Sequence, residues 1–279
     1  MDRCGKIKLM VFTTSFSLIL GIGACLGLFW VAESSPSGQR IPWLLAAWLA
    51  LLGALLGARL AYVLEHLTYF SAHAGAILQF WRGGLAWEGA LAAAVAIFFL
   101  IRQLWGWPLP LVADRLSRLL LPLALAAWAA MWLNGLGYGV TLTENVWWGM
   151  PAADASGVFQ LRTPVQPLAL VSLLVFGGVL EFWLRARERR SGVRALATWI
   201  IFNADMLLFS LLRADPAPAF FGGRVETWMA LLYTFLGILG TIYFFTHRIS
   251  KRPPLGHRLF FQKPKKAAPY ETEPRPGTN

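Results

Sequence analysis

The chain alternates long apolar runs with short polar segments. Seven runs are long and apolar enough to cross a membrane, at residues 9–32, 41–64, 83–101, 119–138, 164–184, 195–212 and 228–246. A helix of about 20 residues crosses roughly 30 Å of hydrocarbon and satisfies its own backbone hydrogen bonds in lipid. A membrane barrel would instead show alternating strands of about ten residues, which this pattern lacks. We therefore expect an all-α, polytopic membrane protein with about seven transmembrane helices.

Composition agrees with this class. Hydrophobic residues make up 57% of the chain and charged residues only 14%, whereas soluble domains carry about 25% charged residues. The net charge is +11, but most of the basic residues fall in alternate loops, around residues 102–118 and 185–194 and after residue 246. Because positive loops stay in the cytoplasm, this distribution predicts an external N-terminus and a cytoplasmic C-terminus. It argues against a nucleic-acid partner.

The chain divides into two parts of different composition. Residues 1–246 contain all seven runs, and we interpret them as a single transmembrane domain. Residues 247–279 are rich in Lys, Arg and Pro, which predicts a disordered cytoplasmic tail. The basic start and the Ile22-Gly23-Ala24-Cys25 segment resemble a lipoprotein signal peptide, but the charge topology favours an uncleaved first helix. Neither a metal site nor a cofactor is predicted, because two cysteines form no ligand spacing.

Two charged residues stand out near the ends of predicted spans. Arg59 lies within the second span, where an arginine is costly unless it faces a cavity or a partner. It could grip a lipid phosphate with two hydrogen bonds, or it could pair with a carboxylate such as Glu65. Glu88 follows the glycine pair Gly83-Gly84 and begins a helix, where the helix dipole favours a carboxylate. It could be a general base or simply a helix-start residue, and we consider Arg59 and Glu88 as the catalytic candidates.

Further polar residues mark later spans. Asn134, Gly135 and Gly139 form a glycine-rich helix end, which can expose backbone N–H groups to an anion or merely stop a helix. Asn203 and Asp205 lie in the middle of the sixth span, and Arg213 follows it. An intramembrane aspartate is a functional candidate by default. We expect Asp205 to pair with Arg59, although a structural role is equally compatible with the pattern.

The order of several motifs carries a resemblance. The chain contains Ala58-Arg59-Leu60-Ala61-Tyr62-Val63, Trp81-Arg82-Gly83-Gly84-Leu85, Asn134-Gly135 with Gly139, Trp148-Gly149-Met150, Arg162-x-Pro164-x-Gln166 and Arg213-x-Asp215-Pro216. Over residues 45–245 this series resembles the bacterial prolipoprotein diacylglyceryl transferase family. These seven-helix enzymes move diacylglyceryl from phosphatidylglycerol to a prolipoprotein cysteine. The resemblance implies a lipid-headgroup site formed by Arg59, Asn134, Gly135, Gly139, Arg162, Gln166 and Arg213, and a prolipoprotein signal peptide as second partner.

The chain also departs from the family pattern at positions that matter for chemistry. Glu88 stands where the family has a histidine, and Trp128 stands where it has a phosphate-binding arginine. Other family positions are changed as well, at Met131, Leu136, Thr163 and Met206. Three hypotheses follow. The chain is a divergent transferase that uses Glu88 and Arg59, a catalytically inactive relative that binds a lipid or a membrane partner, or a transporter that uses Asp205.

Overall fold

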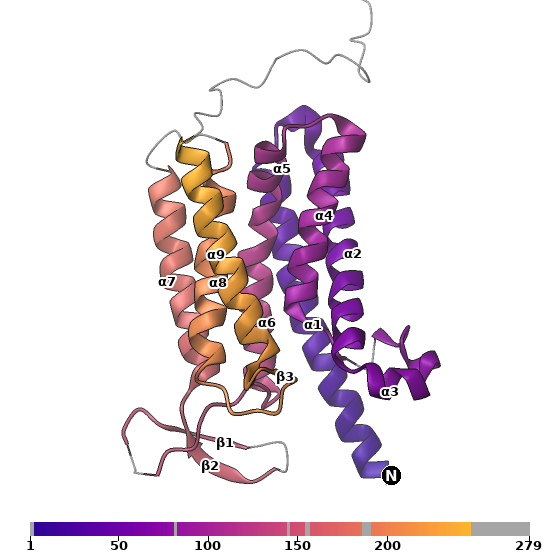
Figure 1. The fold of residues 1–279 in the computed structure, drawn as a ribbon, viewed down its shortest axis with the longest axis vertical. Coiled ribbons are helices and arrows are strands. Elements are labelled where there is room, and N and C mark those ends of the chain that lie inside the picture. Colours follow the sequence, from indigo (N-terminus) through magenta and orange to yellow (C-terminus); the bar gives the residue numbers. More distant parts are fainter. Residues whose placement is uncertain (1–2, 81–82, 144–145, 154–156, 186–190, 247–279) are drawn as a thin grey trace, which may run out of the picture. The chain divides into compact units, whose positions relative to one another are not determined.

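The computed structural model describes residues 3–80, 83–143, 146–153, 157–185 and 191–246, with side chains from residue 15 onward. The predicted tail at 247–279 lies outside this part of the chain. The described part is a helical bundle (Figure 1). Seven of its helical segments are long and apolar enough to cross a membrane. The all-α, polytopic class is thus confirmed.

The observed spans differ from the predicted runs by a few residues at most ends. The spanning helices are α1 (Arg3–Glu33), α2 (Arg40–Glu65), α4 (Trp87–Trp105), α6 (Leu120–Leu133), α7 (Val165–Arg185), α8 (Val193–Ser210) and α9 (Val225–Thr246). The predicted run 119–138 was wrong at both ends. The span begins at Leu109 with α5 (Leu109–Leu116) and η4 (Ser117–Leu119). It ends at Leu133, because Gly135 and Gly137 adopt positive φ, which stops the helix.

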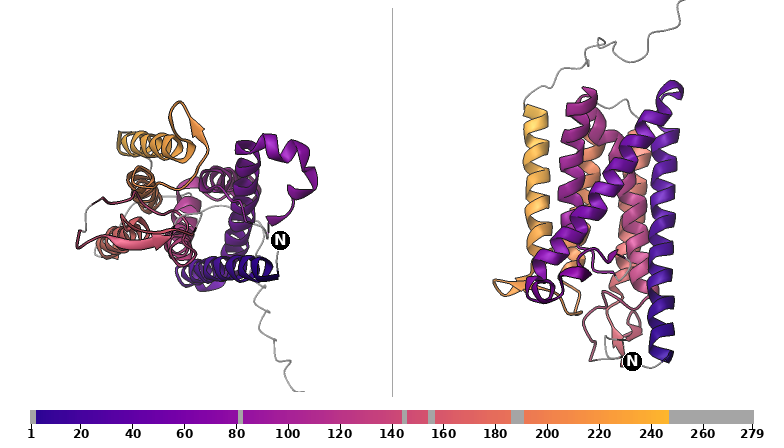
Figure 2. Two further views of the ribbon diagram at one scale, coloured as in Figure 1. Left: turned by 90° about the horizontal axis from the view of Figure 1, so that it is seen from below. Right: turned by 90° about the vertical axis from the view of Figure 1, so that its right-hand side faces the viewer.

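Short elements fill the connections. The segment η1 (Ser37–Gln39) precedes α2, and α3 (Leu67–Ala72) and η2 (Ala74–Ala76) follow it. Two antiparallel hairpins, which the hydrophobic pattern did not predict, are β1 (Met150–Ala153) with β2 (Phe159–Arg162) and β3 (Ala219–Phe220) with β4 (Gly223–Arg224). Figures 1 and 2 show both hairpins at the same end of the bundle as the start of α1. We call this the hairpin end.

Small residues bring neighbouring helices close together. A Cβ atom on Gly57 of α2 would meet the Cβ of Ala93 and the carbonyl oxygen of Gly89 on α4. A Cβ on Gly23 of α1 would meet Ala126 of α6 in the same way. In lipid, close backbone approach of this kind replaces the hydrophobic driving force available in water. Helix α1 thus packs closely against α6 at Gly23 and continues past Cys25 to Glu33.

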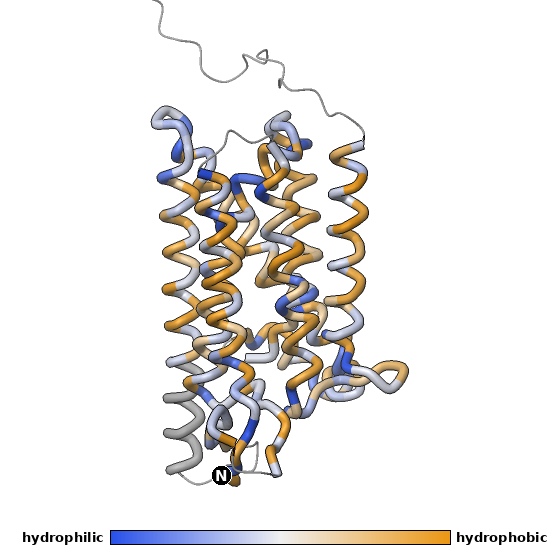
Figure 3. Tube along the Cα trace, turned by 90° about the vertical axis from the view of Figure 1, so that its left-hand side faces the viewer, coloured by the Kyte–Doolittle hydropathy of each residue, from blue (hydrophilic) through white to orange (hydrophobic). Residues whose placement is uncertain are grey.

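The buried interior contains two clusters. One lies at the end of the bundle away from the hairpins, where α1, α2, α4 and α5 meet around Trp43 and Ile101. The other lies among α4, α6, α7, α8 and α9 around Trp128, Phe202 and Tyr233. Large apolar side chains are widely exposed elsewhere on the helices, and Figure 3 shows hydrophobic residues along their length. This is the surface expected of helices that face lipid.

Candidate functional site

Arg59 connects α2 to the loop that follows it through side-chain hydrogen bonds. Its side chain is only 5% exposed. Its Nε atom donates to the Ile77 carbonyl oxygen at 2.8 Å, and Nη2 donates to the Ala76 carbonyl oxygen at 2.6 Å. Its Nη1 atom donates to the carbonyl oxygens of Gly83 at 2.7 Å and Gly84 at 3.0 Å. Four of its five N–H groups are therefore occupied by loop carbonyls.

The glycine pair makes this arrangement possible. Gly83 and Gly84 have φ values of +82° and +77°, in a region that other residues rarely adopt. A Cβ on Gly84 would also strike the ring of Tyr62. The two glycines therefore let the loop backbone come close to α2, where it contacts Arg59.

Glu88 is a buried carboxyl group at the hairpin end. It is 6% exposed and sits in the first turn of α4. Its carboxyl group is hydrogen-bonded to that of Glu65, at the end of α2. The Tyr233 hydroxyl donates to the Glu88 backbone oxygen at 2.9 Å. The two carboxyl groups therefore lie side by side, where like charges would oppose each other. Glu65 thus pairs with Glu88 rather than with Arg59.

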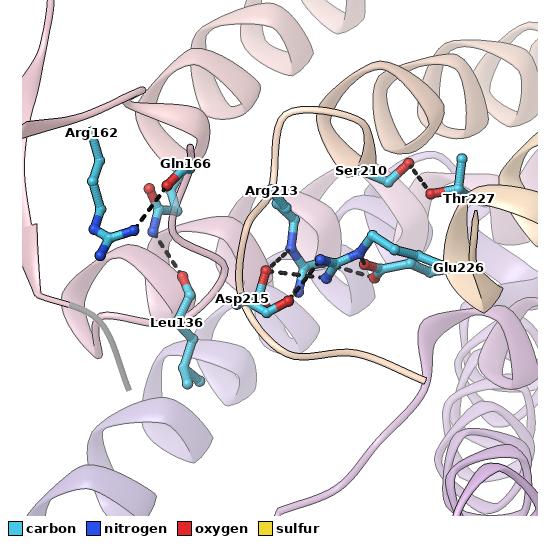
Figure 4. Close-up of polar contacts among 10 residues, drawn as sticks. Leu136, Arg162, Gln166, Ser210, Arg213, Asp215, Glu226 and Thr227 are labelled. Atoms are coloured by element: carbon cyan, nitrogen blue, oxygen red, sulfur yellow. Dashed lines mark hydrogen bonds and ion pairs between the residues drawn. The ribbon is translucent and has the colours of Figure 1, made fainter. Parts of the chain in front are cut away.

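Arg213 is the centre of an ion-pair network (Figure 4). It donates to both carboxylate oxygens of Asp215, at 2.8 and 2.6 Å, and to Glu226 at 2.8 Å. Arg224 donates to Glu226 at 2.6 Å and to Asp215 at 3.1 Å. Burial lowers the pKa of Arg213, but its hydrogen bonds to Asp215 and the nearby Glu226 outweigh burial and raise the pKa overall. The positive charge of Arg213 is thus matched locally.

The glycine-rich segment after α6 is joined to the segment after α8. Gly139 pairs with Arg213 in an isolated antiparallel bridge. Arg162 donates through Nη1 to the Gly139 carbonyl oxygen at 3.4 Å, and Gln166 donates to the Leu136 carbonyl oxygen at 2.7 Å. Figure 4 places these side chains on neighbouring elements at the same end of the bundle. The structure therefore brings four of the expected headgroup residues together.

Asn134 and Gly135 belong to the same segment, and Asn134 contacts α1. The Asn134 Oδ1 atom accepts a hydrogen bond from the Ser15 hydroxyl at 2.8 Å, and its Nδ2 atom donates to the Ala130 carbonyl oxygen at 2.7 Å. Gly135 has a φ of +67° and a free space where a Cβ would lie. Asn134 therefore ties the end of α6 to α1.

Asp205 lies in the interior of the bundle. It accepts a short hydrogen bond from the Ser172 hydroxyl of α7. The indole of Trp128, which is 1% exposed, lies beside it. This approach falls outside normal hydrogen-bond geometry, so Trp128 Nε1 and Asp205 Oδ2 are both buried without a partner among the described residues. The expected pairing of Asp205 with Arg59 was wrong, because Arg59 is bound to the loop.

Asn203 is separate from this group. It is fully buried and donates to the Trp199 carbonyl oxygen at 2.8 Å, one turn earlier in α8. Its Oδ1 atom has no hydrogen-bond partner within the described part of the chain. Asp205 lies two positions further along α8, so the two side chains leave the helix in different directions.

A small cavity lies among α6, α7 and α8. Its volume is about 20 Å³, and its lining includes Arg118, Glu181 and Arg194. This space can hold about one water molecule. Arg194 and Glu181 form an ion pair, and Asp114 accepts hydrogen bonds from the N–H groups of Gly192 and Ala195 at the start of α8. These groups stabilise the helix ends.

Several residues of the hairpin-end cluster were missed in the sequence. Arg224 and Glu226 complete the network that Arg213 forms with Asp215 of its own motif, and Tyr233 joins Glu88. Glu226 could have been found, because it lies in the first turn of the last span and close in sequence to Arg213 and Arg224. Tyr233 carried no such signal, because one tyrosine in an apolar run usually packs in a core.

Comparison with known proteins agrees with the motif series. The family model described as prolipoprotein diacylglyceryl transferase matches residues 6–243. A phosphatidylglycerol–prolipoprotein diacylglyceryl transferase of Streptococcus pneumoniae (strain ATCC 700669) is 28% identical over 247 residues, covering 82% of this chain and 88% of the relative. One from Symbiobacterium thermophilum is 32% identical over 203 residues, covering 68% and 72%. The chain belongs to the prolipoprotein diacylglyceryl transferase family.

Proposed function

We propose that this protein binds a membrane phospholipid, with phosphatidylglycerol as the first candidate, and transfers diacylglyceryl to a prolipoprotein cysteine slowly or not at all. The names of its relatives give phosphatidylglycerol and a prolipoprotein as their substrates. The seven apolar spans place the protein in the lipid where such a substrate resides. The slow chemistry is inferred from the charges of the interior.

The observation that carries this proposal is the position of Trp128 beside Asp205 in the buried interior. The family resemblance implies a phosphate-binding arginine at position 128. In this chain an indole fills the position and packs against Phe209, with a carboxyl group beside it. The reaction of the family releases glycerol phosphate, whose negative charge must be held by preorganised donors. Loss of one such donor typically lowers the rate by about 10²–10³.

The remaining arginines support the same conclusion. Arg213 is matched by Asp215 and Glu226, and Arg59 is bound to carbonyl groups of the loop after α2. Moving either one to a phosphate would break contacts that are already made. We assign headgroup binding to the segment around Gly139, Arg162 and Gln166, where backbone and side-chain donors gather at the hairpin end.

The same proposal includes the orientation in the membrane. Residues 1–246 act as one transmembrane domain of the bacterial inner membrane, with the N-terminus and the hairpin end outside and the basic tail in the cytoplasm. The basic residues of alternate loops support this orientation. A prolipoprotein signal peptide would meet the protein from the outer leaflet.

One observation favours a second candidate, an active transferase with Glu88 as the base. The carboxyl group of Glu88 is buried beside that of Glu65 at the hairpin end. The ionised carboxylate could accept the proton of a substrate thiol, which must ionise before it attacks carbon. In this version Arg59 would hold the phosphate, at the cost of its contacts with the loop.

Complementation separates these candidates. A bacterial strain depleted of its own transferase would express this chain, with the Streptococcus pneumoniae relative as the positive control and equal membrane levels verified by blotting. The proposal predicts that this chain does not restore lipoprotein maturation. Restoration would overturn it in favour of the second candidate. The variants Glu88→Gln and Arg59→Ala would then show which residue carries the reaction.

A further inference from the structure

The β3–β4 hairpin presents two phenyl rings at its tip. Phe220 and Phe221 are 61% and 84% exposed, and their rings meet edge to face with centroids 4.5 Å apart. Phe221 has a φ of +47°, a conformation that bulky residues rarely adopt. The turn therefore holds a large apolar side chain at its outermost point despite an unfavourable backbone conformation.

Hydrogen bonds and ion pairs connect the hairpin to the rest of the hairpin end. Ala219 pairs with Arg224 and Phe220 pairs with Gly223. The indole N–H of Trp228 donates to the Phe220 carbonyl oxygen at 2.9 Å. Arg224 is bound to Asp215 and Glu226, as described above. The tip is thus a fixed projection whose base is the ion-pair network.

The position of the hairpin points to its environment. Helix α9 begins at Val225, directly after the hairpin, and its 22 residues extend about 33 Å, close to the thickness of the hydrocarbon core. The hairpin therefore lies at the depth where α9 enters the membrane. Figures 2 and 3 show it projecting sideways from the bundle beside α9, with a hydrophobic tip.

The lipid-facing side of α9 continues into this tip. Trp228, Leu231 and Phe235 are about half exposed on α9, which spans the membrane. Aromatic rings gather where the headgroups meet the acyl chains, and the phenyl ring has no polar atom that would favour water. A tip of this chemistry at this depth meets lipid on the same surface that α9 already presents.

We propose that Phe220 and Phe221 insert into the boundary between headgroups and acyl chains of the leaflet at the hairpin end. The inserted rings fix the depth of the hairpin and, through Arg224, the depth of the Arg213 network. This inference goes beyond the proposed lipid-binding function and does not depend on whether the protein transfers diacylglyceryl.

Fluorescence from a single labelled cysteine tests the insertion. Cys4 and Cys25 would be replaced by serine, and an environment-sensitive dye would be attached at Phe221→Cys or, in a second variant, at Phe220→Cys. The matched control is Trp147→Cys, also at the hairpin end, where the native side chain is 96% exposed in the loop before β1. Each protein would be reconstituted into phosphatidylglycerol-containing liposomes with nitroxide lipids labelled near the ester groups.

We expect the dye at position 221 to emit at shorter wavelength than the dye at 147, and its quenching by nitroxide lipid to be at least about twofold stronger. Equal emission and quenching at the two positions would overturn the proposal. So would a dye at 221 that is exposed to water in liposomes and becomes shielded only when a lipobox peptide is added, because the tip would then bind peptide. Retention of the helical circular dichroism spectrum confirms folding, and the variant at 220 provides a second reading.

Discussion

The contact between Arg59 and the loop after α2 gives the sharpest prediction about a single residue. Replacing Arg59 by leucine removes four hydrogen bonds to the carbonyl oxygens of Ala76, Ile77, Gly83 and Gly84. We expect the loop to open while the transmembrane helices stay folded. Arg59→Lys should have an intermediate effect, because an ammonium group lacks the planar fork that reaches several carbonyls.

The magnitude follows from the number and burial of these bonds. A hydrogen bond from a charged donor contributes about 1.5–3 kcal/mol. The four do not add fully, since carbonyls released near the membrane surface can bind water. Breaking a buried charged arrangement typically costs about 3–5 kcal/mol in total. With about 1.4 kcal/mol for each factor of ten, the open population of the loop should rise at least about 10²-fold.

Hydrogen exchange measured by mass spectrometry reports this opening. We expect amide exchange in residues 66–86 to accelerate by about 10²-fold in Arg59→Leu and to stay unchanged in helices α7 to α9. The matched control is Arg40→Leu, which removes an exposed arginine whose ion pair with Glu33 is 3.8 Å long. If Arg59 instead served mainly to hold a lipid phosphate, Arg59→Leu would lose lipid binding while loop exchange stayed at the wild-type rate, and our interpretation would be refuted.

Three further predictions follow from packing, charge and topology. Gly57→Leu should lower the free energy of unfolding by about 3 kcal/mol through its clash with α4, measured in detergent, whereas Gly178→Leu, which faces open space, should have little effect; similar losses would contradict the packing. Asp215→Asn and Arg224→Gln should show a coupling energy of about 1 kcal/mol in a double-mutant cycle, and additive effects would argue against the network. Reporter fusions after residues 40, 110, 190 and 250 should all report the cytoplasm; an external signal at 190 and 250 would reverse the orientation.

The spans could be predicted from the sequence because lipid imposes a simple rule on length and polarity. The exception near α6 is instructive. Pro108 and Pro110 begin a short helix whose residues are less apolar than a typical span, so the hydropathy pattern missed it. The glycines at 135 and 137 ended the helix earlier than the apolar pattern suggested.

The candidate residues were easier to find than their partners. Arg59, Glu88 and Asp205 stood out because charged residues are rare in spans. Their contacts depend on loop conformation and on helix rotation, which the sequence pattern does not determine. In the structure, Arg59 donates to loop carbonyl oxygens, Glu88 lies beside Glu65, and Asp205 accepts a hydrogen bond from Ser172. The sequence pattern indicated none of these contacts. The two hairpins were missed because two to four residues per strand produce no alternation that a pattern could reveal.

The central claim is that the interior of this family member does not support efficient transfer. Its most direct test is the initial rate of diacylglyceryl transfer by the purified protein in phosphatidylglycerol liposomes with a lipobox peptide, beside the Streptococcus pneumoniae relative at equal concentration. We expect a rate at least about 10²-fold below that of the relative, because Trp128 and Met206 stand where the resemblance implies cationic residues. A rate within about tenfold of the relative would contradict it.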